Sequence, residues 1–251
     1  MLQKKYILQI LSLLVVGLLS LKLSTDVFNN NLNIDIGDVL QYIIPIFVLY
    51  LINELYFKVD IVIFNKNWFY NIFTKGYYIF IASIIFFSLS ISEFNKSITI
   101  NLIGIYAISC LCTGIFEELL LRGLIQNIIQ NNLKNPLKSI IIASLIFALI
   151  HFVNLISRPY LIIGTISQVG YTFFIGFLLG VIYYVSNSLA CVICLHAIFN
   201  FLSSFVVLYT DMNLPKNNVD INILSLIIQW SVMLPCLFFG MLIYKKNNGN
   251  K

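Results

Sequence analysis

Long apolar stretches divide this chain, and they constrain its fold more than any other feature of the sequence. A helix that crosses a bilayer needs about 20 mostly apolar residues, and eight stretches approach or exceed that length. Only 10% of the 251 residues are charged, against about 25% in a soluble domain. We therefore predict an all-α, polytopic membrane protein with about eight transmembrane helices, in which residues 1–251 form a single integral membrane domain. The predicted spans are Tyr6–Leu23, Val39–Phe57, Gly76–Ile91, Ile98–Ile129, Leu137–Leu155, Ser167–Val185, Ser188–Tyr209 and Ile221–Tyr244.

The small number of charges excludes a cytosolic enzyme, a disordered chain and a nucleic-acid-binding protein, despite the formal net charge of +5. Basic residues flank spans preferentially on the cytoplasmic side. An orientation with both termini cytoplasmic places ten basic residues inside and four outside, Arg122 being set apart. We therefore expect a multi-pass protein of the cell membrane with both termini in the cytoplasm. The inner set is Lys4, Lys5, Lys58, Lys66, Lys75, Lys134, Lys138, Lys245, Lys246 and Lys251, and the outer set is Lys22, Lys96, Arg158 and Lys216.

Three charged residues interrupt the fourth apolar stretch, which reads Glu117-Glu118-x-x-x-Arg122. A charge near the bilayer centre costs about 2.5–3.5 kcal/mol. If the helix ended near Phe116, the three charges would lie at the membrane surface, but apolar residues continue to Ile129. Glu118 and Arg122 share a helix face and can pair, whereas Glu117 is rotated by about 100°. The pattern predicts that one carboxylate is neutralised and that the other remains available as a general base.

The two histidines of the chain also lie in predicted spans, in Phe147-x-x-x-His151 and His196-x-x-x-Asn200. At 1.5 Å per residue, Glu117, His151 and His196 lie roughly 21, 20 and 12 Å from the inner ends of their helices. These depths predict one intramembrane polar site built from three helices. Small residues near the motifs allow close helix contacts, although ordinary membrane packing uses them equally; they are Gly114, Gly123, Ala143, Gly176, Gly180, Ala190 and Ala197.

In this order and hydrophobic context, the three motifs resemble those of the CPBP (CAAX protease and bacteriocin-processing, Abi) family of intramembrane endopeptidases. The resemblance covers residues 98–205, which would form the catalytic core. It implies that Glu117 activates a water that His151 helps to hold, and that His196 and Asn200 stabilise the oxyanion. Supporting roles are implied for Glu118, Arg122 and Phe147, and the implied partners are the lipid bilayer and a peptide or membrane-associated protein substrate.

Two further questions concern cofactors and alternative functions. Glu117, His151 and His196 are potential zinc ligands, but no H-E-x-x-H helix is present, so we expect a site without metal and keep zinc as the alternative. A non-enzymatic bacteriocin immunity or interaction protein would use the polar cluster for structure only. A proton-coupled transporter would use it as a relay, although no internal repeat is visible.

Overall fold

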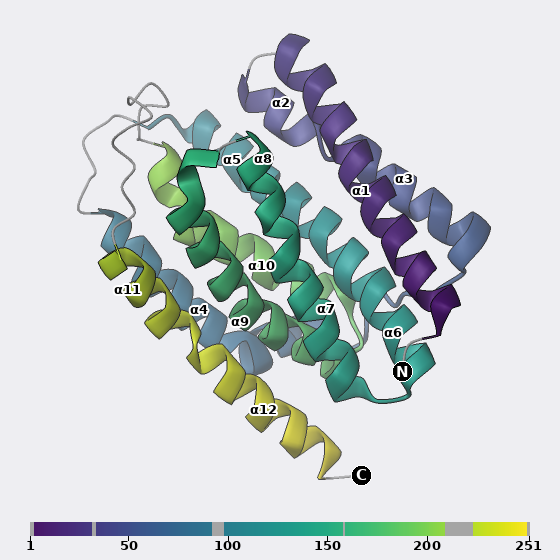
Figure 1. Cartoon of the computed structure of the whole chain (residues 1–251). Coiled ribbons are helices and arrows are strands. Elements are labelled where there is room, and N and C mark those ends of the chain that lie inside the picture. Colours follow the sequence, from purple (N-terminus) through teal and green to yellow (C-terminus); the bar gives the residue numbers. More distant parts are fainter. Residues whose placement is uncertain (1–2, 32–33, 92–97, 158, 209–222, 250–251) are drawn as a thin grey trace.

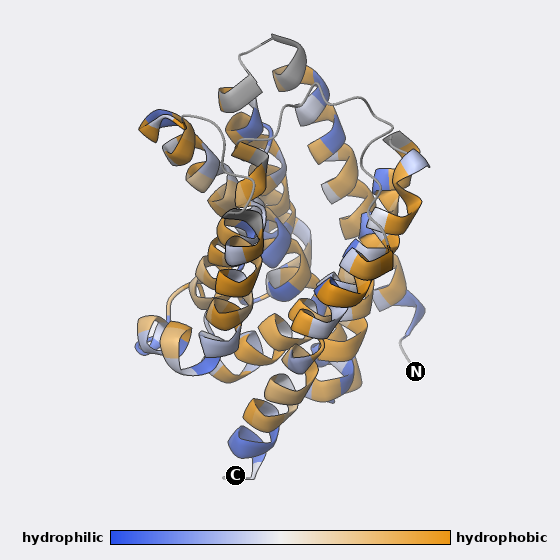
Figure 2. Cartoon of the chain, turned by 90° about the vertical axis from the view of Figure 1, so that its left-hand side faces the viewer, coloured by the Kyte–Doolittle hydropathy of each residue, from blue (hydrophilic) through white to orange (hydrophobic). Residues whose placement is uncertain are grey.

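The structure, a computed structural model, describes residues 3–31, 34–91, 98–157, 159–208 and 223–249, and this part of the chain contains helices and no strands (Figure 1). Seven helical segments within it are long and apolar enough to cross a membrane, and hydrophobic residues dominate them (Figure 2). The prediction of an all-α, multi-pass membrane protein is confirmed. The elements are α1 (Lys4–Asn31), α2 (Ile34–Leu40), α3 (Ile43–Ile52), η1 (Asn53–Phe57), α4 (Trp68–Ile91), α5 (Ile100–Glu118), η2 (Leu119–Gln126), α6 (Asn127–Leu133), α7 (Pro136–Ile150), η3 (His151–Val153), α8 (Asn154–Ser157), η4 (Pro159–Leu161), α9 (Ile162–Ser186), α10 (Leu189–Ser203), η5 (Phe205–Leu208), α11 (Ile223–Met233) and α12 (Pro235–Asn248).

The predicted span Ser188–Tyr209 is shorter than expected. Its helix, α10, has 15 residues and is therefore roughly 22 Å long, less than the hydrocarbon core of about 30 Å. The helix packs against α4, α5 and α9, and Leu195 is completely buried. The apolar character of α10 thus reflects burial inside the protein rather than contact with lipid. Tyr209 lies outside the described residues, as does Ile221, the predicted start of the last span.

Two other predicted spans are interrupted. Residues 39–57 fall into α2, α3 and the π-helical η1, with a break before α3, in whose first turn Pro45 lies. Residues 223–248 divide into α11 and α12 at Leu234, directly before Pro235. Proline lacks a backbone N–H and cannot continue the helical hydrogen-bond pattern. Hydropathy alone identifies these spans as continuous because the flanking residues are equally apolar.

Helix α9 runs through the interior and contacts α7, α10 and α12. Leu178, Leu179 and Ile182 on this helix are completely buried. The first residues of α1 and the last residues of α12 lie at the same end of the bundle (Figure 1). The three motifs begin on α5, α7 and α10; α10 contacts α5, and α9 contacts both α7 and α10.

Candidate active site

The two adjacent glutamates end helix α5, and a π-helical segment, η2, follows them immediately. A π-helix has wider turns than an α-helix and occurs often at functional sites. Arg122 lies in this segment, and its Nε is 3.1 Å from Oε2 of Glu118. Both side chains are almost completely buried. The predicted pairing of Glu118 with Arg122 is confirmed, although the α-helix expected over residues 98–129 is replaced by a π-helix at this point.

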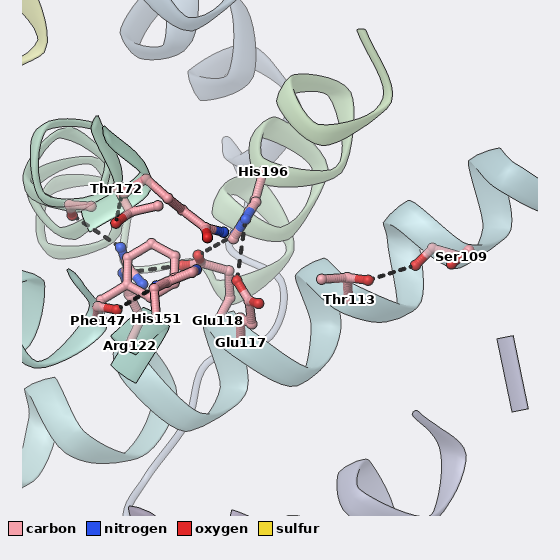
Figure 3. Close-up of polar contacts among 11 residues, drawn as sticks. Ser109, Thr113, Glu117, Glu118, Arg122, Phe147, His151, Thr172 and His196 are labelled. Carbon is pink, nitrogen blue, oxygen red and sulfur yellow. Dashed lines mark hydrogen bonds and ion pairs between the residues drawn. The ribbon is translucent and has the colours of Figure 1, made fainter. Parts of the chain in front are cut away.

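His196 connects the two glutamates, whose side chains converge on it in Figure 3. Its Nδ1 is 2.7 Å from Oε1 of Glu118, and its Nε2 is 3.4 Å from Oε2 of Glu117. Because a carboxylate only accepts hydrogen bonds, an ionised Glu118 requires that Nδ1 carries a proton. When Nε2 is protonated as well, the positive charges of His196 and Arg122 balance the two carboxylates. The cluster can therefore be electrically neutral as a whole.

Access to solvent distinguishes Glu117 from its neighbours. Its side chain is 26% exposed, whereas those of Glu118, Arg122 and His196 are 0%, 1% and 5% exposed. The adjacent residue Glu118 forms the internal ion pair. Glu117 is consequently the more exposed of the two carboxylates.

Arg122 contacts Glu118 one turn earlier in its own helix and two residues of other helices. It pairs with Glu118, its Nη2 donates a hydrogen bond of 3.0 Å to the carbonyl oxygen of Gly176, and its guanidinium lies 4.9 Å from the ring centroid of Phe147. A Cβ at Gly176 would lie 3.0 Å from Phe147 and 3.5 Å from Arg122. The absence of a side chain at Gly176 therefore lets α9 approach the ion pair.

Two buried atoms of the ion pair have no well-directed hydrogen bond within the described part of the chain: Nη1 of Arg122 and Oε2 of Glu118. The contact between Arg122 Nε and Glu118 Oε2 at 3.1 Å is thus an ion pair without hydrogen-bond geometry. The attraction between these groups depends mainly on their opposite charges in a region from which solvent is excluded.

His151 lies at the edge of the cluster. It follows the last residue of α7 and begins the 3₁₀ turn η3, and it lies within the candidate membrane span Pro136–Ile156, as predicted. Its Nδ1 is 2.8 Å from the carbonyl oxygen of Phe147, which only accepts hydrogen bonds, so Nδ1 is the donor. In the neutral ring, Nε2 then has the lone pair. The ring of Phe147 contacts both histidines, at centroid distances of 5.1 Å to His151 and 5.9 Å to His196.

Asn200 is one helical turn from His196 on α10, but its side chain has no hydrogen bond to another described residue. The hydroxyl of Tyr106 donates to the backbone carbonyl of Asn200 at 3.3 Å. The amide of Asn200 is therefore not engaged in an internal hydrogen-bond network of the described residues.

The potential zinc ligands Glu117, His151 and His196 do not form a suitable set. No three His, Cys, Asp or Glu side chains in the described parts of the chain are arranged to hold a metal ion. Both nitrogens of His196 already face carboxylates. The arrangement does not fit the zinc alternative.

Helix α9 contributes to the site although the motifs contain none of its residues. Besides the bond from Arg122 to Gly176, the side-chain amide of Gln126 donates a 3.1 Å hydrogen bond to the carbonyl oxygen of Gly180. Arg122 and Gln126, four residues apart on η2, thus donate to the carbonyl oxygens of Gly176 and Gly180, four residues apart on α9. The spacing Gly176-x-x-x-Gly180, typical of close helix contacts, was the sequence signal for this contact. The spacing did not indicate that the polar side chains of Arg122 and Gln126 would contact α9 at these glycines.

Comparison with protein families identifies one match. Residues 99–202 match the family described as type II CAAX prenyl endopeptidase Rce1-like. The match contains all three motifs and confirms the predicted resemblance to the CPBP family over this segment, which is less than half of the chain. No curated protein and no solved structure matches the chain.

Proposed function

We propose that this chain is an intramembrane endopeptidase in which Glu117 activates the hydrolytic water. The observation that carries the proposal is the difference between the two adjacent glutamates. Glu118 is buried and paired with Arg122, whereas Glu117 is 26% exposed and lies 3.4 Å from His196. Glu117 is therefore available as a catalytic base, whereas Glu118 stabilises the site through its ion pair with Arg122. The family description of the matched segment, an endopeptidase, supports the same activity.

In the proposed reaction, Glu117 takes a proton from water while the water oxygen bonds to the scissile carbonyl carbon. The electron pair of the C=O double bond moves to the carbonyl oxygen, which becomes an oxyanion. The C–N bond then breaks as the oxyanion collapses, and the departing nitrogen takes the proton from Glu117. The products are a carboxylic acid and an amine.

The surrounding side chains have distinct proposed roles. His151 accepts a hydrogen bond from the water through Nε2, since its Nδ1 is used by the Phe147 carbonyl. Asn200 donates a hydrogen bond to the oxyanion, and so does the Nε2–H of doubly protonated His196, which the oxyanion shares with Glu117; each such donor is worth roughly a hundredfold to a thousandfold in rate. Arg122 and Glu118 act through His196, because Glu118 holds the imidazole by its Nδ1.

The proposed substrate is a peptide or membrane-associated protein whose scissile bond enters the membrane, and a bacteriocin precursor is one such peptide. We further propose that both termini face the cytoplasm. The first residues of α1 and the last of α12 lie at one end of the bundle (Figure 1), and Lys4, Lys5, Lys245 and Lys246 lie at these ends, as expected of a cytoplasmic face.

The test uses purified full-length protein in lipid vesicles and a panel of single-span peptides, with products identified by mass spectrometry. The wild type is expected to cleave members of the panel, and Glu117→Gln to cleave them about 100- to 10,000-fold more slowly. Asp26→Asn is the matched control, because this carboxylate pairs on the surface with Lys22, and it should cleave at the wild-type rate. Equal rates for wild type and Glu117→Gln would overturn the proposal.

The same variant separates this proposal from a non-enzymatic immunity function. If the chain protects cells from a bacteriocin by proteolysis, Glu117→Gln cells lose protection although the protein is present in the membrane at the wild-type level. Full protection by Glu117→Gln would show that binding alone suffices.

A further inference from the structure

A cavity of about 1010 Å³ lies between α3, residues 58–67, α5 and α10. Its wall on α5 and the start of η2 consists of Leu111, Ile115 and Leu119, which are spaced four residues apart. Glu117 is two positions from both Ile115 and Leu119 and is therefore rotated by about 200° from each around the helix. The cavity thus lies behind the catalytic helix, on the side away from the proposed base.

The cavity has an apolar wall with charge at one end. Its lining follows α3 and the first residue of η1 from Ile43 to Asn53, over roughly 15 Å, and Glu54 and Asp60 come at the end of this run. Neither carboxylate has a basic partner within 4.0 Å in the described part of the chain. The end of the cavity consequently has a negative charge that the protein itself does not neutralise by direct pairing.

Local hydrogen bonds fix this acidic end. The buried side chain of Asn53 accepts from the N–H of Val59 at 2.9 Å and donates to its carbonyl oxygen at 3.0 Å. Farther along, the first N–H groups of α10, on Leu189 and Ala190, donate to the carbonyl oxygens of Val62 and Ile63, each at 2.9 Å. The segment that carries Asp60 is therefore held at both ends, and the position of the negative charge is built into the fold.

The shape and composition of the wall indicate what fills it. Helices that pack in membranes meet through small residues, but large side chains dominate this wall, and Phe47, Tyr50 and Phe64 are more than half exposed. Such a surface suits flexible acyl chains better than a rigid helix. Trp68 also lines the cavity, and tryptophan is enriched at the level of lipid headgroups.

The geometry points to a phospholipid site in which the acyl chains lie along α3 and α5 and Glu54 and Asp60 bind an ammonium group of the headgroup. The negative charge selects against anionic headgroups, and the carboxylates accept hydrogen bonds from a primary ammonium. The bound lipid covers the apolar back of the helix that carries Glu117, so it stabilises the catalytic helix without contacting the reacting atoms.

The test measures lipid retention and does not require a substrate. Purified full-length protein is exchanged with phosphatidylethanolamine or phosphatidylglycerol of identical chains, and bound lipid is counted by native mass spectrometry. We expect the wild type to retain the ethanolamine lipid up to about fivefold more than the glycerol lipid, the upper end of the range expected for an exposed ion pair. We expect the double variant Glu54→Gln, Asp60→Asn to retain both lipids equally. The control Asp26→Asn keeps the wild-type preference.

A second readout is thermal stability in detergent, because a ligand that binds only the folded protein raises the unfolding temperature. Phosphatidylethanolamine should raise it for the wild type and for Asp26→Asn, and less for the double variant. The proposal is wrong if the double variant keeps the lipid preference, or if the wild type retains no lipid. It is also wrong if a single-span peptide ending in lysine displaces the lipid from the wild type, which would identify a helix-docking groove.

Discussion

Replacing Arg122 by methionine removes the buried positive charge of the site while preserving most of the side-chain volume. The guanidinium is 1% exposed, 3.1 Å from the Glu118 carboxylate and 3.0 Å from the Gly176 carbonyl oxygen. Breaking a buried pair from one side typically costs about 3–5 kcal/mol, because the remaining charge stays buried without its partner. We expect Arg122→Met to lower the free energy of unfolding by about that amount. Adding Glu118→Gln to Arg122→Met removes the unpaired charge. The double variant should regain about 1–3 kcal/mol of the lost free energy of unfolding.

The measurement is a double-mutant cycle of the unfolding free energy in detergent micelles, with Arg122→Met, Glu118→Gln and the double variant. Lys22→Met is the control, since it breaks an ion pair of the same i,i+4 spacing whose side chains are 70% and 51% exposed, and its effect should stay below about 1 kcal/mol. An interaction energy near zero between positions 118 and 122, or an Arg122→Met effect no larger than that of Lys22→Met, would refute the reasoning.

Three further predictions concern packing and the loop that positions the acidic end of the cavity. Gly180→Ala places a Cβ 3.0 Å from both Gln126 Oε1 and Ile140 Cγ2, and it should lower the unfolding free energy by about 1–3 kcal/mol. Gly104→Ala meets no atom within 4 Å, and it should change that energy by less than about 1 kcal/mol; equal effects would contradict the packing argument. Asn53→Ala leaves the backbone groups of Val59 without their buried partner, so proteolysis after Lys58 should become faster, and an unchanged cleavage rate would refute the role of Asn53.

The membrane fold and the composition of the polar cluster could be predicted from the sequence because both depend on large energies. Apolar stretches of spanning length leave few alternatives to transmembrane helices. Glu118 and Arg122 are costly in a membrane unless they pair, and the structure pairs them. The prediction that His196 lies in one site with the two glutamates is also confirmed.

Other features had no clear signal because they depend on tertiary contacts. Apart from Gly123, the residues of the π-helical turn at Leu119–Gln126 are equally suited to an α-helix. The length of α10 was overestimated because a helix buried in protein and a helix in lipid are similarly apolar. The simultaneous contact of His196 with both glutamates requires the actual distance between α5 and α10, which spacing along the chain does not contain.

The role of Gly176 in the site could not be predicted from the sequence either. Its backbone carbonyl accepts the Arg122 hydrogen bond, and backbone acceptors leave no specific residue pattern in a sequence. The close glycine spacing on α9 indicated a tight contact but not its partner.

Whether Glu117 activates the hydrolytic water can be measured as the single-turnover cleavage rate of Glu117→Gln with a peptide that the wild type cleaves. The amide keeps the size of the side chain but does not act as a base. We expect a rate about 100- to 10,000-fold below that of the wild type, with unchanged peptide affinity and unfolding temperature. A rate equal to that of the wild type would contradict it.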